Sequence, residues 1–546
     1  MTAGTRSAAR PVLAVDQGTS GTKALVLCPR RGVIGSGSAP VHPREGPGGL
    51  VEVDPAELYG SVVRAGRQAL ADAGEPVAAV GLANQGETVL AWDRATGRPL
   101  TAALVWQDRR AASVCAELAP HAEALRQLTG LPLDPYFAAP KMTWLRRHLT
   151  REGTVTTSDV WLVHRLTGAY VTDAATAGRT QLLDLDRVAW SGTALGIFGL
   201  DGEDLPEIVD CDTLVGTTTA FGPELPLTGL LVDQQAALLA QRVTEPGTAK
   251  CTYGTGAFLL AQTGPQPRRG DSGLVSCVAW RLSGETSYCL DGQVYTAASA
   301  VRWLTGLGVV SGAADLDRVG GSVPDSGGVT FVPALAGLAA PWWRGEARGS
   351  LTGLGLGTRP GHLVRALCEG LAAQVTALAD AAARDLGRPL TVLRVDGGLT
   401  RSALLMQTQA DLLQLPVEVS ALPDATALGI GAVARLGQEP GLTVDEAVPH
   451  WRPRTVYEPR IDADEAAERL TVFHAAVTAE LERTDRTEHT AREGGAPLPA
   501  PRPARTAADT EADTEAEADT HAAADTERAA GARPTGGAER AAGTDR

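Results

Sequence analysis

A turn rich in glycine, serine and threonine joins two apolar segments near the start of the chain. The stretch AVDQGTSGTKALV spans residues 14–26, with Asp16 before the turn, Thr19 and Ser20 within it, and Lys23 after it. Backbone amides and hydroxyls of such a turn can bind phosphate oxygens, and glycine permits close approach. Asp16 could bind Mg²⁺ through water. An ordinary hairpin has the same pattern, so this motif alone leaves both interpretations open.

Two further glycine turns occur later in the chain. CTYGTGAF, residues 251–258, places Thr255 in a second strand–turn–strand motif, and LRVDGGLTRS places Asp396 and Gly398 between a strand and a helix. Each is typical of an ordinary turn when taken alone. As a pair, the two hairpins would bind a nucleotide's phosphates from both sides, and the third turn would let a nucleoside ring lie against bare backbone.

Carboxylates and aromatic side chains follow several apolar segments. Asp233 ends the strand-like LLV and begins a helix-like segment, where a helix cap is the favoured local interpretation and a general base is the alternative. Glu87, Trp106 and Tyr136 suit a polyol site, since an indole packs against C–H groups while carboxylates accept hydrogen bonds from hydroxyls. A tryptophan core anchor beside surface charges is the ordinary alternative.

The elements that must position these residues alternate between strands and helices. Asp54, Pro55 and Gly74 have the types expected at the cap, first position and stop of one helix, and Asp424 is expected to cap another. Helices are predicted over 54–74, 158–167, 234–242, 362–386, 402–413 and 424–436. Strands are predicted over 12–15, 24–28, 77–83, 88–92, 227–232, 250–253, 257–261 and 390–395. The pattern occurs twice, over about 11–243 and 247–438, which predicts two α/β domains.

Composition excludes several classes of partner. The net charge of −15 disfavours nucleic acid and anionic membranes. The chain contains no run of about 18 apolar residues, and its first residues lack the apolar core of a secretory signal. The seven cysteines are scattered without a C-x-x-C pair, so neither a disulfide framework nor a zinc site is expected. These features favour the cytoplasm.

The last part of the chain has a different composition. Between residues 494 and 546 the only large aliphatic residue is Leu498, and near-repeats such as ADTEADTEAEADT occur. Such a segment cannot bury enough apolar surface to offset its chain entropy, so disorder is predicted. A solvated helix in the alanine- and glutamate-rich part is the lesser alternative.

Nine stretches in this order resemble the FGGY family of carbohydrate kinases, and within it the glycerol kinases. They are VDQGTSGTKALV, NQGETVLAWDRATGRPL, ALVWQDRR, DPYFAAPK, VTDAATAGRT, LLVDQQAALLAQ, AKCTYGTGAFLL, PALAGLAAPWW and LRVDGGLTRSALLMQ. The resemblance implies an α/β fold of two ribonuclease-H-like, actin-type ATPase domains with a cleft between them. The expected division is an N-terminal polyol-binding domain over 11–243, a C-terminal nucleotide-binding domain over 247–484, and a disordered tail over 485–546.

The resemblance also assigns roles by position. It implies a magnesium contact at Asp16 and a general base at Asp233. The residues implied to contact the polyol are Glu87, Trp106, Tyr136, Asp233, Gln234 and Phe258. Those implied to contact ADP or ATP are Thr19, Ser20, Lys23, Thr255, Arg302, Gly398 and Ser402.

Some positions depart from the glycerol kinase pattern. Gly86 stands where those enzymes have an arginine that binds substrate hydroxyls, while Arg302 replaces a usual glutamine and Ser402 a usual asparagine. A hydrogen bond to a charged group is worth about 1.5–3 kcal/mol, so the loss at Gly86 matters. Either Arg109 or Arg110 substitutes, or the pocket accommodates a larger polyol.

The expected reaction is phosphoryl transfer from MgATP to a primary hydroxyl of a small polyol, with glycerol first. Erythritol or a ketose such as xylulose is the alternative within the family. An actin- or Hsp70-like ATPase switch and a non-catalytic sugar sensor are the alternatives from other classes. We expect a small-molecule substrate and no nucleic-acid or membrane partner; a homodimer or a homotetramer is compatible with these expectations.

Overall fold

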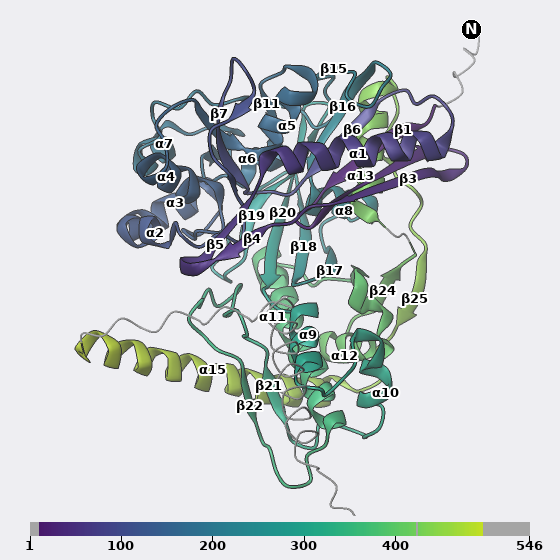
Figure 1. Ribbon diagram of the computed structural model, residues 1–546. Helices are drawn as coiled ribbons and strands as arrows, with labels where there is room; N and C mark the ends of the chain where they lie inside the picture. The colour runs from purple at the N-terminus through teal and green to yellow at the C-terminus, as the bar shows by residue number, and fades with distance from the viewer. Residues whose placement is uncertain (1–9, 422–423, 495–546) are drawn as a thin grey trace, which may run out of the picture. The chain divides into compact units, whose positions relative to one another are not determined.

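The computed structural model describes residues 10–421 and 424–494. One of its two six-stranded N-terminal sheets has the strand order β15-β16-β6-β1-β2-β3 (Figure 1). Strand β1 pairs antiparallel with β2 and parallel with β6, which pairs parallel with β16. The strands span Val12–Gln17 (β1), Gly21–Cys28 (β2), Gly32–Pro40 (β3), Val80–Asn84 (β6), Gly216–Thr218 (β15) and Leu225–Val232 (β16).

The C-terminal sheet repeats this arrangement. In its order, β19-β20-β18-β17-β23-β24-β25, the hairpin β17–β18 precedes a parallel neighbour, β23, just as β1–β2 precedes β6. The strands span Thr248–Tyr253 (β17), Ala257–Gly264 (β18), Val275–Leu282 (β19), Glu285–Val294 (β20), Val392–Asp396 (β23), Val417–Ser420 (β24) and Pro453–Tyr457 (β25). The two glycine turns therefore lie at equivalent places in two similar sheets.

A second six-stranded sheet and three strand pairs complete the set. The six-stranded sheet has the order β10-β7-β9-β5-β4, with β8 beside β7, and carries the strand after Glu87 and the strand before Trp106. Its strands span Arg44–Gly46 (β4), Leu50–Val53 (β5), Val89–Asp93 (β7), Arg98–Pro99 (β8), Ala103–Leu104 (β9) and Thr154–Thr157 (β10). The two-stranded pairs are Val171–Asp173 (β11) with Glu207–Val209 (β14), Leu183–Asp184 (β12) with Ala189–Trp190 (β13), and Thr330–Val332 (β21) with Ser350–Thr352 (β22).

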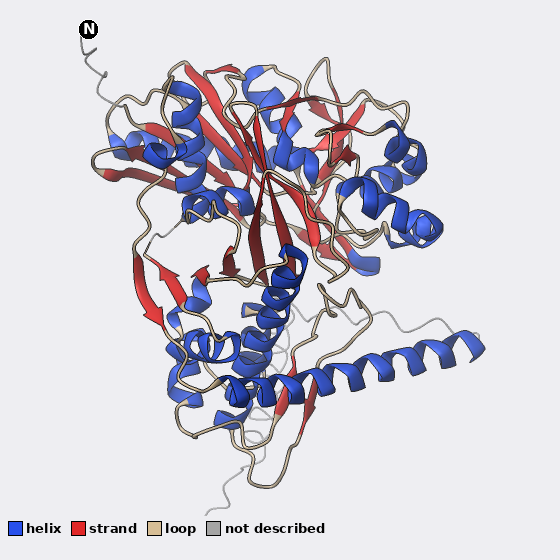
Figure 2. Cartoon of the chain, turned by 180° about the vertical axis from the view of Figure 1, so that it is seen from behind, coloured by secondary structure: helices blue, strands red, loops and turns tan. Residues whose placement is uncertain are grey.

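The helices cover the sheets (Figure 2). The α-helices span Pro55–Ala73 (α1), Ala112–Leu118 (α2), Ala122–Thr129 (α3), Ala138–His148 (α4), Ser158–Thr167 (α5), Ala174–Gly178 (α6), Gly192–Phe198 (α7), Asp233–Ala240 (α8), Ala298–Gly306 (α9), Leu316–Gly320 (α10), Pro360–Leu386 (α11), Ala403–Leu413 (α12), Ala425–Gln438 (α13), Val444–Ala447 (α14) and Ala463–Gly494 (α15). Short 3₁₀ turns occur at Pro47–Gly49, Ala119–His121, Ala313–Asp315 and Gly398–Arg401.

The predicted limits of the first long helix are confirmed. The carboxylate of Asp54 accepts a hydrogen bond from the amide of Ala56, Pro55 is the first residue of α1, and Gly74 ends it in the left-handed conformation at φ 64°. Three other predictions need correction. The N-cap of α8 is Val232 rather than Asp233, and Asp424 is left-handed at φ 63° without capping α13. Helix α15 also continues to Gly494, past residue 485; the disorder predicted for 495–546 lies outside the described residues.

Helix α13 packs on the N-terminal sheet although it follows strands β17–β24 of the C-terminal sheet in sequence. It lies against β1, β6, β16 and α8. The approach is close at two glycines: a Cβ on Gly429 would lie 1.9 Å from the carbonyl oxygen of Ala236, and one on Gly81 would lie 2.6 Å from that of Ile430. Only glycine allows these contacts. At Gly429, α13 packs directly on the backbone of α8, and at Gly81, β6 packs directly on the backbone of α13.

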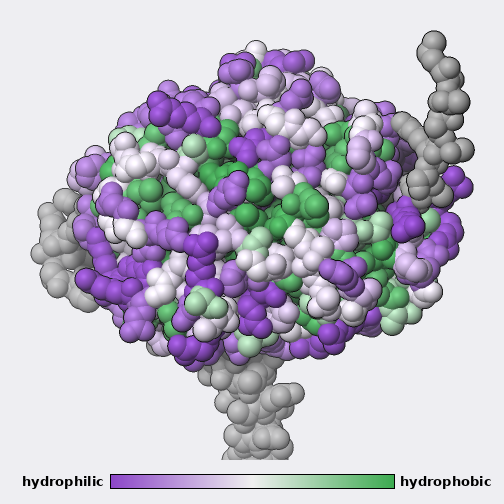
Figure 3. Space-filling model, turned by 90° about the horizontal axis from the view of Figure 1, so that it is seen from above, coloured by the Kyte–Doolittle hydropathy of each residue, from purple (hydrophilic) through white to green (hydrophobic). Residues whose placement is uncertain are grey.

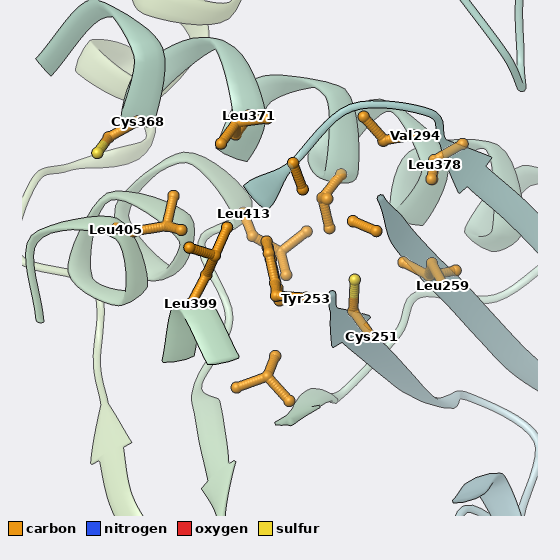
Figure 4. Close-up of a cluster of buried hydrophobic side chains, with 14 of the residues drawn as sticks. Cys251, Tyr253, Leu259, Val294, Cys368, Leu371, Leu378, Leu399, Leu405 and Leu413 are labelled. Atoms are coloured by element: carbon orange, nitrogen blue, oxygen red, sulfur yellow. The ribbon is translucent and has the colours of Figure 1, made fainter. Parts of the chain in front are cut away.

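Two of the hydrophobic cores combine residues from segments that are far apart in the sequence. One combines Leu231, Leu260, Cys277 and Ile430, from β16, β18, β19 and α13. The other lies around Tyr253, Leu371 and Leu405 in the C-terminal part (Figure 4). The division of the chain between residues 243 and 247 stays a prediction, and β18–β20 and α13 contribute to the core beneath the N-terminal sheet.

Seen from above, the surface mixes hydrophilic and hydrophobic residues (Figure 3). Within residues 10–421 and 424–494, no helix has the length and apolar character needed to cross a membrane.

Adding a methyl group at Gly429 tests the packing of α13. The change Gly429→Ala should lower the free energy of unfolding by about 1–3 kcal/mol, because the new Cβ would meet the backbone of α8. Gly306→Ala is the matched control, since a Cβ there meets no atom within 4 Å. Chemical denaturation of both variants measures the difference, and equal stabilities would contradict the packing argument.

Candidate active site

The β1–β2 turn contacts an aromatic side chain of the neighbouring sheet. The hydroxyl of Thr19 accepts a hydrogen bond from the indole Nε1 of Trp106 at 2.8 Å and donates one to the Oε1 of Gln85 at 3.1 Å. Ser20 is exposed, and Lys23 forms an ion pair with Asp424. This turn therefore has an exposed hydroxyl and a cation, and it is fixed to Trp106.

Three aromatic residues that were predicted to contact the polyol lie together. The ring of Trp106 is 5.7 Å from that of Tyr136 and 6.4 Å from that of Phe258, both in edge-to-face geometry. Phe258 is at the start of β18, immediately after the second glycine turn. Trp106 thus contacts the first turn through Thr19 and the strand leaving the second turn through Phe258.

A buried arginine that the sequence analysis missed holds Glu87. The guanidinium of Arg179 donates to the Oε1 of Glu87 at 2.6 Å, to the Oδ2 of Asp291, and to the hydroxyl of Tyr136 at 3.4 Å. Burial raises the pKa of Glu87 and Arg179 opposes that rise. Glu87 also has a positive φ of 59°, an uncommon conformation that functional sites often retain.

Neither of the two arginines suggested by the sequence reaches Glu87. Arg110 binds Asp108 and Glu52, and Arg109 pairs with Asp134 at 3.3 Å. The guanidinium beside Glu87 belongs to Arg179, which follows the short helix α6. Gly86 is buried, and a Cβ at this position would meet only the Cγ2 of Val232, at 3.2 Å.

Asp233 is the first residue of α8, directly after β16. Its Oδ1 accepts a hydrogen bond from the amide of Gln234 at 2.6 Å, and its carbonyl oxygen accepts one from the hydroxyl of Thr426 at 3.5 Å. Burial raises the pKa of Asp233 to about 6, with a contribution from the charge of Glu87. A carboxyl with this pKa is mainly ionised at neutral pH and can still accept a proton.

Two buried lysines order the residues around this carboxylate. The Nζ of Lys250 donates to the Oε1 of Gln234 at 2.7 Å, and its charge lowers the pKa of Asp233. The Nζ of Lys141 donates to three backbone carbonyls at residues 135–137, which fixes the turn that carries Tyr136. Burial lowers the pKa of Lys141 to about 7.

The predicted nucleotide contacts differ in their surroundings. Thr255 and Arg302 are exposed, and the carbonyl of Thr255 accepts a hydrogen bond from the amide of Ala297 just before α9. Gly398 is exposed in the DGG turn. Ser402 is buried: it caps α12, and its hydroxyl donates to the Oδ1 of Asp317 at 2.5 Å. Its side chain is therefore already committed to protein contacts.

The surroundings of Asp16 suit a cation. Burial raises the pKa of Asp16 to about 7, and the nearby charges of Asp233 and Asp424 add to this rise. Among the described residues, however, no three side chains of histidine, cysteine, aspartate or glutamate are grouped as a metal site.

The missed residues have weak local signals. Arg179 follows a run of small residues in VTDAATAGRT, and Asp291 lies within a strand. Lys250 gave the stronger hint, since a lone lysine inside a buried strand needs a partner. Their roles depend on contacts between segments about 100 residues apart, which periodicity does not reveal.

Comparisons with known proteins identify related proteins for both halves of the chain. Residues 11–240 match the N-terminal domain of the FGGY family of carbohydrate kinases, and residues 249–436 match its C-terminal domain. A glycerol kinase of Aromatoleum aromaticum is 42% identical over 484 residues, covering 85% of this chain and 98% of its own. One of Alkalilimnicola ehrlichii is 42% identical over 485 residues, covering 85% and 97%.

Solved structures are similar as well. The crystal structure of Plasmodium falciparum glycerol kinase with ADP has a TM-score of 0.80 at 30% identity, covering 86% of this chain and 98% of its own. A xylulose kinase from Rhodospirillum rubrum has a TM-score of 0.77 at 24% identity, covering 87% and 100%, and so shares the fold. The predicted two-domain, actin-type α/β fold is confirmed. The chain belongs to the FGGY family of carbohydrate kinases.

Proposed function

We propose that this kinase transfers the γ-phosphoryl group of ATP to a primary hydroxyl of glycerol. The observation that carries the proposal is the position of Asp233, a partly exposed carboxylate at the start of α8. Its charge and that of Glu87 interact, and Glu87 belongs to the group containing Tyr136 and Trp106. The similarity to glycerol kinases over most of the chain supports glycerol as the first substrate to test.

The polyol would lie against the aromatic wall and be oriented by carboxylates. The rings of Trp106 and Phe258 would contact its C–H groups, while Glu87 and the side-chain amide of Gln234 would bind its hydroxyls. Asp233 would orient the reacting hydroxyl and take its proton as the oxygen attacks phosphorus. Arg179 directs the carboxylate of Glu87 and opposes the rise of its pKa, and Lys250 orients the side-chain amide of Gln234.

The two glycine turns would bind the nucleotide's phosphates. Thr19, Ser20 and Lys23 supply donors from the first turn and Thr255 from the second, with Arg302 and Gly398 toward the nucleoside. Asp16 would hold Mg²⁺, which would neutralise charge developing on the phosphates. Catalysis of this kind depends mainly on positioning and electrostatic stabilisation.

Removing the proposed base tests the assignment of Asp233. The change Asp233→Asn should lower kcat by at least about 100-fold, because an amide cannot take the proton, while ATP binding stays near its original value. A coupled ADP-release assay and calorimetry measure the two effects. Asp271→Asn, at a side chain that is 96% exposed, is the matched control. Turnover within tenfold of the original would count against the assignment.

Substitutions of Arg179 test its role in orienting Glu87. Arg179→Met should reduce kcat/KM for the polyol by about 10- to 100-fold, since a charged hydrogen bond is worth about 1.5–3 kcal/mol. Arg179→Lys should keep part of the activity because the charge remains while the planar fork is lost. The KM for ATP should change little. Arg187→Met, at an 83% exposed side chain, is the control, and equal losses for both substrates would refute the orienting role.

Gly86→Arg tests the substrate class. The assay would compare glycerol, dihydroxyacetone, tetritols, pentitols and ketopentoses for the original enzyme and the variant. A guanidinium beside Glu87 should shift preference toward glycerol, because it fills space and adds donors for a three-carbon polyol. Gly86→Ala is the control, since it adds only a methyl group near Val232. No shift with Gly86→Arg would show that this position does not select the substrate.

A further inference from the structure

Two cysteines face each other on neighbouring strands behind the candidate active site. Cys277 on β19 and Cys289 on β20 are directly opposite in the antiparallel register, and their sulfur atoms are 3.5 Å apart. Opposed residues in such a ladder have Cα atoms about 4.5–5.5 Å apart, within the range that a disulfide spans. Both are free thiols in this structure, and both are buried.

Cys277 also touches two side chains close to Glu87 and Asp233 in the sequence or in space. Its sulfur accepts contacts at 3.8 Å from the Nη1 of Arg179 and at 3.8 Å from the Nε2 of Gln235. Arg179 holds Glu87, and Gln235 lies two residues beyond Asp233 on α8. A movement of this sulfur would therefore change the surroundings of both Arg179 and Gln235.

We propose that Cys277 and Cys289 form a redox-active dithiol, and that a hydroperoxide converts it to a disulfide that lowers kinase activity. The proposal rests on the proposed function for its effect on activity, but the chemistry of the thiols is independent of that function. It assigns this pair of strands as a modification site next to Arg179.

The electronic environment decides which sulfur reacts first. The S–H of Cys289 and the guanidinium of Arg179 hold the pKa of Cys277 below its usual value, and the same interaction raises the pKa of Cys289. Cys277 is thus the thiol of the pair that loses its proton more readily, and the thiolate is the form that attacks an oxidant. The pair is buried, so the reagent must be small, and hydrogen peroxide is close to water in size.

The reaction balances with peroxide as the two-electron oxidant. The Cys277 thiolate attacks one peroxide oxygen, the O–O bond breaks, and sulfenic acid and hydroxide form. The Cys289 thiol then attacks that sulfur, forming the S–S bond, and the sulfenic hydroxyl leaves as water after taking the thiol's proton. Overall, two thiols are oxidised, and hydrogen peroxide is reduced to two waters.

The disulfide changes the site because sulfur must move. The S–S separation falls from 3.5 Å to about 2.05 Å. Cys277 draws away from Arg179 and Gln235, so the contacts of its sulfur with the guanidinium and with the side-chain amide weaken. Displacement of catalytic groups by about 1 Å can cost up to about 100-fold in rate. We expect kcat/KM for the polyol to fall at least about tenfold.

Peroxide treatment of the full-length, reduced enzyme tests the proposal. Peptide mass mapping should find a 277–289 disulfide, activity should fall about tenfold or more, and dithiothreitol should restore it. The mapping does not depend on activity, so failure of the dithiol and failure of the kinase assignment are distinguishable. Absence of the disulfide under peroxide, or full activity with the disulfide formed, would overturn the proposal.

Cysteine variants separate this pair from the more accessible thiols. Cys289→Ala removes the second sulfur and leaves the contacts of Cys277 to Arg179 and Gln235. The reduced variant should be active. After peroxide treatment it should not show the dithiothreitol-reversible inactivation of the original enzyme. Cys289→Ser provides a second version if the alanine variant is unstable. A Cys28→Ala/Cys115→Ala enzyme, lacking two partly exposed thiols, should remain sensitive. Inactivation that persists in both Cys289 variants would overturn the proposal.

Discussion

The buried guanidinium of Arg179 connects the parts of the candidate site. It lies between Glu87, from the loop after β6, and Asp291, on β20, and it also reaches the hydroxyl of Tyr136. A charge taken out of water is costly unless it is paired and hydrogen-bonded, so the three elements that carry these partners are tied to one geometry. The network thereby joins a loop of the N-terminal part to a strand of the C-terminal sheet.

Helix α13 provides the corresponding mechanical support for Asp233. It reaches back from the end of the C-terminal family domain to pack on the N-terminal sheet and on α8. The contact of Gly429 with Ala236 and the hydrogen bond from Thr426 to the carbonyl of Asp233 place its first turn beside the proposed base. The Lys23–Asp424 pair connects the residue just before α13 to strand β2. The proposed base, Asp233, and the proposed substrate contact, Glu87, thus both depend on segments that are distant in sequence.

Local sequence chemistry predicted much of the architecture. The caps at Asp54 and Gly74, the long helix ending before Gly387 and the two glycine hairpins follow from residues within one or two turns of each other. The same local rules failed at Asp424 because its carboxylate pairs with Lys23, 401 residues away, instead of capping α13. They also favoured a cap at Asp233, where the carboxylate accepts the amide of the next residue as α8 begins.

The sequence by itself determined the repeated α/β pattern, the two glycine turns and the aromatic and acidic residue types of the candidate polyol site, because turns, caps and periodicity are local properties. Only the tertiary structure decided that Arg179, rather than Arg109 or Arg110, lies beside Glu87. It also decided that Lys250 contacts Gln234 and that Cys277 faces Cys289. These contacts arise from sheet register and helix packing, which bring distant segments together and which no single segment specifies.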